Sequence, residues 1–378
     1  MSLKFGIDLG TTNSSIAYAT DPSHVKIMQF HVGTEAPPYS ASMVSSKVFI
    51  REDRGGKTDI QVGYKAQAAY RKFSFTDAKL IECLKLAVEE KSDWSVHIGA
   101  TTYEASDIFA KILAVLKQQA QNDIRADSLT ADGVVIGVPV DFKDASKSIY
   151  LDALVKAGFY KSRYEATKKT EFVSEPLAVA VTNGIDLHSD KNVMVFDFGG
   201  GTLDVTIVNL KEQINRLVKL HPHEVKAKRR ITCGGEKLTR LFFTNSFCAK
   251  EKYGVPELAE AFELPRNLTP DELWNEMQKT SDGQQFCEEV EKLKCALSVR
   301  NDATFTFMGD DGVIVDDCDF SRADFEQAIR EETSKMDALI NQCLEDAEMS
   351  ANRIDEVILA GGSALIPCVQ SLLISRFG

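Results

Sequence analysis

The chain has 378 residues, of which 44% are hydrophobic and 26% are charged. That length and balance predict two or three compact domains and exclude both a single small binding module and a disordered chain. The net charge of −12 at pH 7 disfavours general nucleic-acid binding, which needs a basic surface. Because we find neither an apolar run long enough to span a membrane nor a signal-peptide pattern, we expect a cytoplasmic protein that binds no membrane.

The cysteine pattern indicates reduced thiols. The 8 cysteines form no Cys-x-x-Cys pair and have no spacing typical of zinc ligands. Free thiols are therefore the prediction, and a disulfide framework or a zinc site is the alternative.

Two segments repeat one pattern, in which a short apolar strand runs into an aspartate, glycines and hydroxyl residues. They are Phe5–Ser14 and Val193–Thr202, which align with Asp8 on Asp197. A second β-rich run follows each, and a strand, a glycine turn and a strand predict a hairpin. Because the copies lie half a chain apart, we predict a duplicated protein with one hairpin in each of two lobes, both facing a shared cleft.

The chain between the two hairpins predicts a buried strand and two helices. The apolar run Val134–Val140 is bounded by loop residues, as buried strands are. A helix is predicted over Asp144–Ala157, with Asp144 as its cap and Gly158 as its stop. A second helix is predicted over 174–184, with Pro176 in its first turn.

After the second hairpin, a basic run, a capping motif and a long periodic segment follow. The run Lys226–Arg230 is interpreted as a solvated loop or a strand edge, and the acidic total disfavours a nucleic-acid site. Thr269–Glu272 has the capping-box pattern with proline at the first helical position. From Ser321 onward, helical spacing predicts one long helix with a buried stripe. The stripe consists of Phe325, Ile329, Met336, Ile340 and Cys343.

A helix predicted over Phe286–Val299 carries two stripes. The apolar stripe consists of Phe286, Val290, Leu293 and Leu297. The polar stripe lies about 100° around the axis and consists of Glu291, Lys294 and Ser298. The apolar stripe anchors the helix, and the polar stripe can face a ligand. A surface ion pair between Glu291 and Lys294 on a solvated face is the alternative.

Strands that alternate with helices imply an α/β architecture with buried sheets. We place lobe I at residues 1–185 with an outer subdomain at about 37–110. Lobe II is placed at 186–378 with an outer subdomain at about 225–305.

The two glycine turns are candidate phosphate sites, since the N–H groups of such a turn can surround an anion. Gly199, Gly200 and Gly201 form the stronger candidate, because glycine weakens a sheet element and needs a compensating use. A hairpin tip without a ligand is the alternative. Two such turns that face each other would form a phosphate clamp.

Carboxylates inside a phosphate site need a cation between them and the ligand. Asp8 and Asp197 therefore imply Mg²⁺, held through its waters. A metal and amide donors supply the positioning and charge neutralisation that phosphoryl transfer requires. Glu175 and Asp204 could orient an attacking water. Equally, they could be a helix N-terminal charge and a hairpin-end turn residue.

Four motifs, in order along the chain, resemble the signatures of the heat-shock protein 70 (DnaK-type) chaperone ATPase domain. They are Gly6–Ser14, Phe196–Asp204, Glu291–Ser298 and Gly361–Pro367, with weaker matches at Val138–Phe142, Ser174–Pro176 and Gly234–Glu236. The resemblance implies an actin-like ATPase (ribonuclease H-like) fold, with two duplicated lobes around a nucleotide cleft. The cofactors it implies are ATP or ADP, Mg²⁺ and K⁺.

The resemblance also implies a role for each matching residue. Phosphate contacts are implied for Gly10, Thr11, Thr12, Asn13, Gly199, Gly200, Gly201 and Thr202. Further nucleotide contacts are implied for Gly234, Gly235, Glu291, Lys294, Ser298, Gly361, Gly362, Ser363 and Leu365. Asp8 and Asp197 would organise Mg²⁺ and K⁺, with Asp204 nearby and Glu175 supporting the waters of the metal. Thr11 and Thr202 complete this catalytic set.

One departure from the family pattern concerns hydrolysis. Gln67 stands where family members carry a catalytic lysine, and a neutral amide cannot supply positive charge at the γ-phosphate. Lys65 and Lys72 are close enough in sequence to substitute. Unless a lysine does so, we expect slow or absent ATP hydrolysis.

Other departures concern the adenine and the exchange factor. Cys295 and Leu365 stand where many members carry arginines that sandwich the base, so weaker nucleotide binding or relaxed base selectivity is expected. The chain between Gly235 and Glu291 is longer than usual, so a standard exchange partner cannot be assumed. Pro139 matches the switch proline of the family, and Lys147 replaces its arginine partner.

The resemblance implies the nucleotide-binding domain of a chaperone whose peptide-binding domain is absent from this chain. We expect a monomer that is part of a longer protein; a naturally short protein is the alternative. J-domain co-chaperones, nucleotide-exchange factors and unfolded clients are the implied partners. A non-hydrolysing ATP-binding co-chaperone or scaffold is the second hypothesis, and a small-molecule kinase of the same superfamily is the third.

Overall fold

The computed structural model describes residues 3–21, 24–36, 40–53, 55–72, 78–124, 131–183, 191–210, 225–310 and 312–378. The chain divides into two compact units, Met1–Ala178 and Val179–Gly378. The unit boundary falls within helix α6 (Glu175–Thr182). The expected helix end at Gly184 lies outside the described residues. The lobe boundary at 185/186 and the subdomain ranges stay predictions.

The main sheet of the first unit contains the first predicted hairpin. Its strand order is β11-β10-β1-β2-β3, with β4 paired to β2. The strands are β1 (Lys4–Leu9), β2 (Asn13–Asp21), β3 (His24–Ile27), β4 (Val44–Ser45), β10 (Gly133–Val138) and β11 (Thr170–Ser174). The antiparallel pairing of β1 with β2 confirms the hairpin. The strand predicted from the apolar run at 134–140 is β10, which pairs in parallel with β1.

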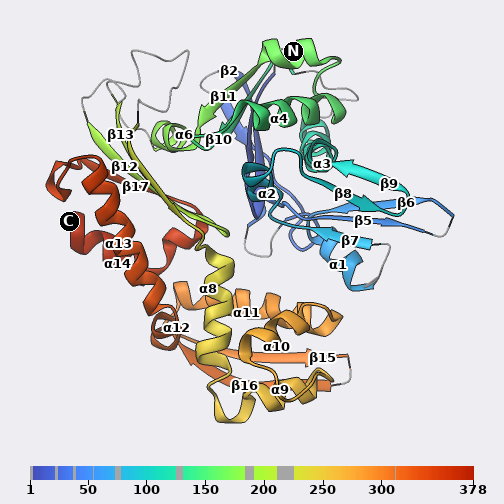
Figure 1. Cartoon of the computed structure of the whole chain (residues 1–378), viewed down its shortest axis with the longest axis vertical. Coiled ribbons are helices and arrows are strands. Elements are labelled where there is room, and N and C mark those ends of the chain that lie inside the picture. Colours follow the sequence, from blue (N-terminus) through green and yellow to red (C-terminus); the bar gives the residue numbers. More distant parts are fainter. Residues whose placement is uncertain are drawn as a thin grey trace. The chain divides into compact units, whose positions relative to one another are not determined.

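Two helices of the first unit lie side by side against this sheet (Figure 1). They are α3 (Ala105–Ile124) and α4 (Asp144–Lys156). The rings of Phe109 and Tyr150 join them edge to face, with centroids 4.9 Å apart. The predicted cap is wrong by one residue: Lys143 is the N-cap and makes no side-chain cap bond, whereas Asp144 is the first helical residue. There its carboxylate still faces the positive end of the helix dipole. Gly158 has φ +75 just beyond the helix, as predicted for its stop.

The remaining elements of the first unit form two small sheets and short helices. One sheet has the order β6-β5-β7, and the other pairs β8 with β9. The strands are β5 (Val48–Glu52), β6 (Thr58–Val62), β7 (Ala78–Ile81), β8 (Ser95–Ile98) and β9 (Thr101–Glu104). The helices are α1 (Tyr64–Lys72), α2 (Leu84–Glu90) and α5 (Arg163–Lys169).

The main sheet of the second unit contains the second predicted hairpin. Its strand order is β14-β13-β12-β17. The strands are β12 (Asn192–Phe198), β13 (Leu203–Asn209), β14 (Val225–Ile231) and β17 (Glu356–Ala360). The antiparallel pairing of β12 with β13 confirms the hairpin. The basic run forms β14 at one end of the strand order, which confirms its interpretation as a strand edge.

Helices and one more strand pair complete the second unit. The strand pair is β15 (Asp302–Gly309) with β16 (Gly312–Ser321). The α-helices are α8 (Gly235–Phe242), α9 (Val255–Ala261), α10 (Pro270–Met277), α11 (Ser281–Val299), α12 (Arg322–Ala328), α13 (Arg330–Asp346) and α14 (Pro367–Phe377). Short turns of other helix types are η2 (Phe243–Phe247), η3 (Glu251–Tyr253), η4 (Ala351–Arg353) and η5 (Gly362–Leu365). The capping box predicted at Thr269 is present and begins α10.

The prediction of one long helix from Ser321 is wrong. The segment forms α12 and α13, with a break at Ile329, whose ψ of 6 leaves the helical region. The five residues of the predicted stripe are nevertheless buried. The spacing therefore indicated the buried face correctly but not the continuity of the backbone hydrogen bonds, since a one-residue break keeps the same face inward.

A cluster of phenylalanine rings fills the core of the second unit. Phe286 of α11 is fully buried. Its ring centroid lies 5.2 Å from those of Phe305 and Phe307 and 5.3 Å from that of Phe247. These contacts have the edge-to-face geometry that adds stability beyond area burial.

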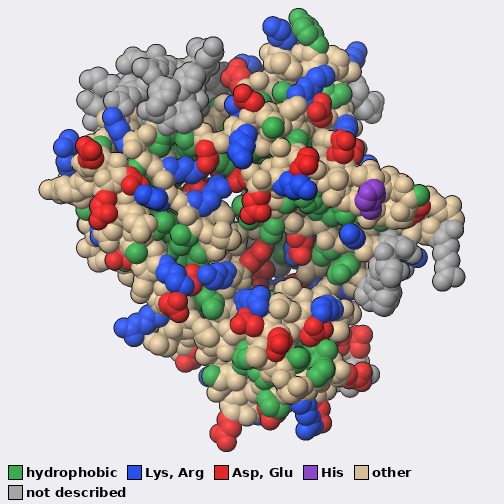
Figure 2. Space-filling model, viewed as in Figure 1, with side chains coloured by type: hydrophobic (Ala, Val, Ile, Leu, Met, Phe, Trp, Pro, Cys, Tyr) green, Lys and Arg blue, Asp and Glu red, His purple; other side chains and the backbone are tan. Residues whose placement is uncertain are grey.

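The distribution of charged side chains and the state of the cysteines agree with what the sequence predicts. Basic and acidic side chains are interspersed over the face drawn in Figure 2. None of the eight cysteines forms a disulfide, in agreement with the prediction of reduced thiols. Among the described residues, no helix has the length and apolar character needed to cross a membrane.

Candidate functional site

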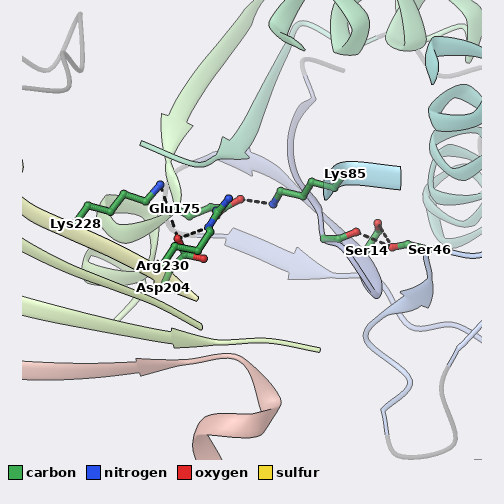
Figure 3. A network of polar contacts seen from close by, with 8 residues as sticks. Ser14, Ser46, Lys85, Glu175, Asp204, Lys228 and Arg230 are labelled. Carbon is green, nitrogen blue, oxygen red and sulfur yellow. Dashed lines mark hydrogen bonds and ion pairs between the residues drawn. The ribbon is translucent and has the colours of Figure 1, made fainter. Parts of the chain in front are cut away.

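The glycine turn of the first unit joins β1 to β2 and leaves no room for a side chain at Gly10. A Cβ atom on Gly10 would lie 2.1 Å from the carbonyl oxygen of Asn13. Ser46 fixes the turn from outside: its hydroxyl donates to the Gly10 carbonyl at 2.9 Å, and its N–H donates to the Thr12 carbonyl at 2.8 Å. The Ser14 and Ser46 hydroxyl oxygens are 2.8 Å apart (Figure 3). The turn is therefore held in one conformation.

Beside this turn, the buried Lys85 forms an ion pair with Glu175 and interacts electrostatically with Asp8. Lys85 Nζ donates to Glu175 Oε1 at 2.5 Å (Figure 3). Glu175 is the first residue of α6, and Lys85 lies in the first turn of α2. The protein around Asp8 removes water and so raises the pKa of its carboxyl group; Lys85 opposes this shift and Glu175 adds to it. This end of β1 thus combines two carboxylates and one ammonium group.

A strained residue precedes Lys85. Cys83 has φ +51 and ψ +29, a left-handed conformation that a residue with a side chain adopts at a cost of about 1–2 kcal/mol. It turns the chain from β7 into α2, where Leu84 and Lys85 are both buried. The left-handed backbone at Cys83 therefore sets the direction in which α2 begins.

Gln67 contacts Lys47 rather than Lys85. It is buried on α1, and its Oε1 accepts a hydrogen bond from Lys47 Nζ at 3.0 Å. Lys47 also forms an ion pair with Glu82 at 2.7 Å. Lys65, one of the two expected substitutes, pairs instead with Glu35 at 2.6 Å and has a half-exposed side chain. The other, Lys72, is the exposed last residue of α1.

The glycine turn of the second unit is held by one hydrogen bond of its own and by two other segments. Within the turn, Gly199 N–H donates to the Thr202 carbonyl at 3.0 Å. The N–H groups of Gly235 and Glu236, at the start of α8, donate to the Gly199 and Gly200 carbonyls, both at 3.0 Å. The Ser363 hydroxyl, in the segment after β17, donates to the Gly199 carbonyl at 2.9 Å.

Glycines make this close packing possible. A Cβ atom on Gly234 would lie 2.1 Å from the carbonyl oxygen of Gly200. Gly361 has φ +78, and its Cβ atom would lie 2.3 Å from the carbonyl oxygen of Phe198. We call this close-packed set of backbone atoms the cradle; glycine is required at both positions because an added methyl group would clash with it.

Lys294 belongs to this cradle rather than to the surface. Its Nζ donates to the Gly235 carbonyl at 2.9 Å and to Thr239 Oγ1 at 2.8 Å, and 7% of its side chain is exposed. Glu291 is 4.0 Å away. The interpretation of this pair as a surface ion pair is therefore wrong for Lys294. The structure brings Lys294, Gly235 and Ser363 together, since a Cβ on Gly235 would lie 2.6 Å from Ser363 Oγ and 3.3 Å from Lys294 Nζ.

The other expected nucleotide residues lie near this cradle in sequence or on its helices. Ser298 Oγ donates to the Lys294 carbonyl at 3.1 Å. Leu365 ends η5 with 62% of its surface exposed, and Gly362 begins the same turn. A Cβ on Gly362 would meet no atom within 4 Å. The described contacts do not assign a ligand to these three residues.

Asp204 lies between basic side chains of β14. Arg230 Nε donates to Asp204 Oδ1 at 2.7 Å, and Lys228 Nζ lies 3.7 Å from the same oxygen (Figure 3). In the β12–β13 register, Asp204 is paired with Asp197. The two cations therefore offset one of two like charges on neighbouring strands.

The expected metal site can be tested only within each unit. Among the described residues, no group of three or more His, Cys, Asp and Glu side chains could hold a metal ion. The assignment of Asp8 and Asp197 to a metal held through water stays a prediction. Oxygen donors of this kind suit Mg²⁺.

Comparison with known families assigns the chain. The sequence model described as Hsp70 protein matches residues 4–219 and 272–378. The chain belongs to the Hsp70 family. The resemblance noted in the motifs is thereby confirmed, and with it the actin-like ATPase fold of the α/β class. Hsp70 membership also supports an ATP-binding domain of the chaperone type.

The Hsp70 model does not match residues 220–271 of this chain. This segment contains β14, α8 and α9. It therefore includes Gly234 and Gly235, which contact the second glycine turn. Hsp70 proteins generally bind ATP or ADP with Mg²⁺ and typically work with J-domain proteins and exchange factors.

Sequence reasoning missed the side chains that hold the motifs in place. Ser46, Lys85, Lys228 and Arg230 each contact a predicted site residue, and none lies in a motif. For Lys228 and Arg230 the basic run Lys226–Arg230 contained a usable signal. Residues two apart on a strand lie on the same face, so the run could have predicted that both side chains lie on one face of the strand. For Ser46 and Lys85 the sequence contains no comparable signal.

The serine contact predicts an effect on nucleotide affinity. In Ser46→Ala the Gly10 carbonyl loses its donor, and we expect ADP affinity to fall about tenfold, the equivalent of about 1.4 kcal/mol. Titration calorimetry measures this. Ser42→Ala is the control, because its hydroxyl contacts Ser40 rather than the turn. Equal affinities of both variants and the parent would contradict the role given to Ser46.

Proposed function

We propose that this chain is the nucleotide-binding domain of an Hsp70-like chaperone, in which one glycine turn from each unit binds the phosphates of a single ATP or ADP. The observation that carries the proposal is the repeated turn. In each unit a hairpin turn is closed by contacts from a distant segment, and in each a Cβ at one glycine position would lie 2.1 Å from a backbone oxygen. A hairpin tip without a ligand has no need of such close fixing.

The residues present fit the cofactors of the family. Asp8 and Asp197 would hold Mg²⁺ and K⁺ through water, supported by Glu175 and Asp204. Thr11, Thr12 and Asn13 would bind phosphate from the first turn, and Gly200, Gly201 and Thr202 from the second. Bound Mg²⁺ would offset the charge of the phosphates.

Exchange of ATP for ADP would shift the population of conformations of the domain and so regulate the binding of unfolded proteins. The same proposal implies three kinds of partner, namely unfolded client proteins, a J-domain protein and an exchange factor. A non-hydrolysing ATP-dependent scaffold is the second candidate, because the amide of Gln67 carries no charge. Cytoplasmic location and a role in stress response also remain proposals.

Binding and turnover, measured on one sample, test the proposal and separate the two candidates. We expect ATP and ADP to bind in calorimetry with Mg²⁺, and their affinity to fall when EDTA removes the metal. ATP hydrolysis, followed by release of phosphate, supports the chaperone ATPase. Binding without hydrolysis supports the scaffold, and a chain that binds no adenine nucleotide contradicts both.

The exposed Leu365 gives a prediction on base recognition. In Leu365→Arg, a planar guanidinium replaces an aliphatic side chain that is 62% exposed. Stacking of this group on adenine contributes about 0.5–2 kcal/mol, so we expect ADP affinity to rise about tenfold. Calorimetry with ADP and GDP measures the gain. Ile374→Arg, at a similarly exposed position on α14, is the control for added charge, and an equal gain there would refute the stacking argument.

A further inference from the structure

A buried lysine lies at the acidic end of β1, on an element that none of the family motifs covers. Lys85 is 8% exposed. Lysine is almost never buried to this extent unless it is paired, because removing its charge from water is costly. Its partner is Glu175, whose Oε1 lies 2.5 Å from Lys85 Nζ. The contact joins the first turn of α2 to the first residue of α6 within the first unit.

The charges around Lys85 show what it balances. Burial by itself lowers the pKa of Lys85, but electrostatic interactions with Glu175, Tyr150 and Asp8 outweigh burial and hold the pKa above its usual value. Lys85 in turn opposes the upward shift in the pKa of Asp8. Lys85 is thus a cation that pairs with Glu175 at the start of α6 and is attracted electrostatically by Asp8, on β1 beside the glycine turn.

The other lysines near this region have other partners. Lys47 binds Gln67 and Glu82. Lys65 binds Glu35, with 51% of its side chain exposed. Of these three lysines, Lys85 is the one that combines burial with a carboxylate partner next to Asp8.

We propose that Lys85 supplies, from α2, the positive charge that Gln67 cannot supply. The proposal rests on the proposed function, since it concerns the hydrolysis of ATP bound at the first glycine turn. In that reaction a water oxygen forms a bond to the γ-phosphorus while the bond to the β–γ bridging oxygen breaks, which gives ADP, inorganic phosphate and a proton. Lys85 is a positioning residue in this step: it holds Glu175 in place and offsets the carboxylate charge that would otherwise repel the phosphates and the attacking water.

Single-turnover hydrolysis in the full chain tests the proposal. The Lys85→Gln variant removes the charge but keeps a donor for Glu175. We expect the hydrolysis rate of bound ATP to fall about 100-fold, whereas the affinities for ATP and ADP change less than about threefold. Lys85→Arg keeps the charge and should retain most of the rate. Lys65→Gln is the matched control and should leave rate, affinity and melting temperature unchanged.

A second substitution tests whether the two positions are equivalent. The double variant, which carries both Lys85→Gln and Gln67→Lys, should hydrolyse bound ATP at least about tenfold faster than Lys85→Gln alone. In the parent chain, where the charge is already present, Gln67→Lys should raise the rate by less than about threefold. The single variant Gln67→Lys also tests the proposal if Lys85→Gln does not fold. A rise of about 100-fold in its hydrolysis rate would show that the parent lacks the positive charge and would overturn the proposal.

The remaining outcomes are distinct. An unchanged rate in folded Lys85→Gln overturns the role of Lys85. A parent chain that binds ATP but does not hydrolyse it also overturns this role and leaves ATP binding intact. A parent chain that binds neither ATP nor ADP in calorimetry overturns the proposed function itself.

Discussion

A Gly10→Ala variant is expected to lose ADP binding by at least about 100-fold, or about 2.7 kcal/mol. The added methyl group would lie 2.1 Å from the Asn13 carbonyl oxygen, so the turn must open. Opening it breaks the contact of the Gly10 carbonyl with Ser46 and displaces the N–H groups that would bind phosphate. Titration calorimetry with ADP and Mg²⁺ measures the loss.

Gly6→Ala is the matched control for this effect. Gly6 lies on β1, the strand that leads into the turn, and a Cβ there meets no atom within 4 Å. We expect this variant to bind ADP as the parent does. If Gly10→Ala keeps its melting temperature and the affinity of the parent, the first turn does not bind the nucleotide.

A Phe286→Ala variant is expected to destabilise the second unit by about 3–5 kcal/mol. Its ring is fully buried and makes edge-to-face contacts with the rings of Phe247 in η2, Phe262 just after α9, and Phe305 and Phe307, which both lie on β15. The cavity left behind cannot be filled by neighbours that are themselves rigid rings. Urea denaturation, followed by circular dichroism, measures the change in the free energy of unfolding.

Val299→Ala on the same helix is the control, since Val299 is 82% exposed and surface substitutions change stability by less than about 0.5 kcal/mol. Should Phe286→Ala unfold at the same urea concentration as the parent, the aromatic cluster is not the stabilising core of this unit. Phe286→Leu should fall between the two variants, because it retains part of the buried volume.

Local patterns in the sequence predicted the parts of the fold that depend on neighbouring residues. The hairpins at Asp8 and Asp197, the capping box at Thr269 and the stop at Gly158 each follow from the backbone chemistry of a few adjacent positions. Helical spacing also indicated which residues of α12 and α13 are buried. It did not predict the break at Ile329, since burial and hydrogen-bond continuity are different properties.

The contacts that complete each half of the candidate site depend on tertiary packing. Glu175 and Lys85 are 90 positions apart, and Asp204 and Arg230 are 26 apart. Such pairs form because sheet order and helix placement bring them together, and no short motif encodes either contact. The glycines were identified from their pattern, whereas the side chains that fasten the turns required the structure.

The start of α8 touches the second glycine turn through two N–H groups, and the far end of the same helix continues into Phe243 and the aromatic cluster. Because α8 is held at both ends, a movement of one end displaces the other. A molecule that binds at the far end of α8 and moves it would therefore also displace the second glycine turn, without contacting that turn.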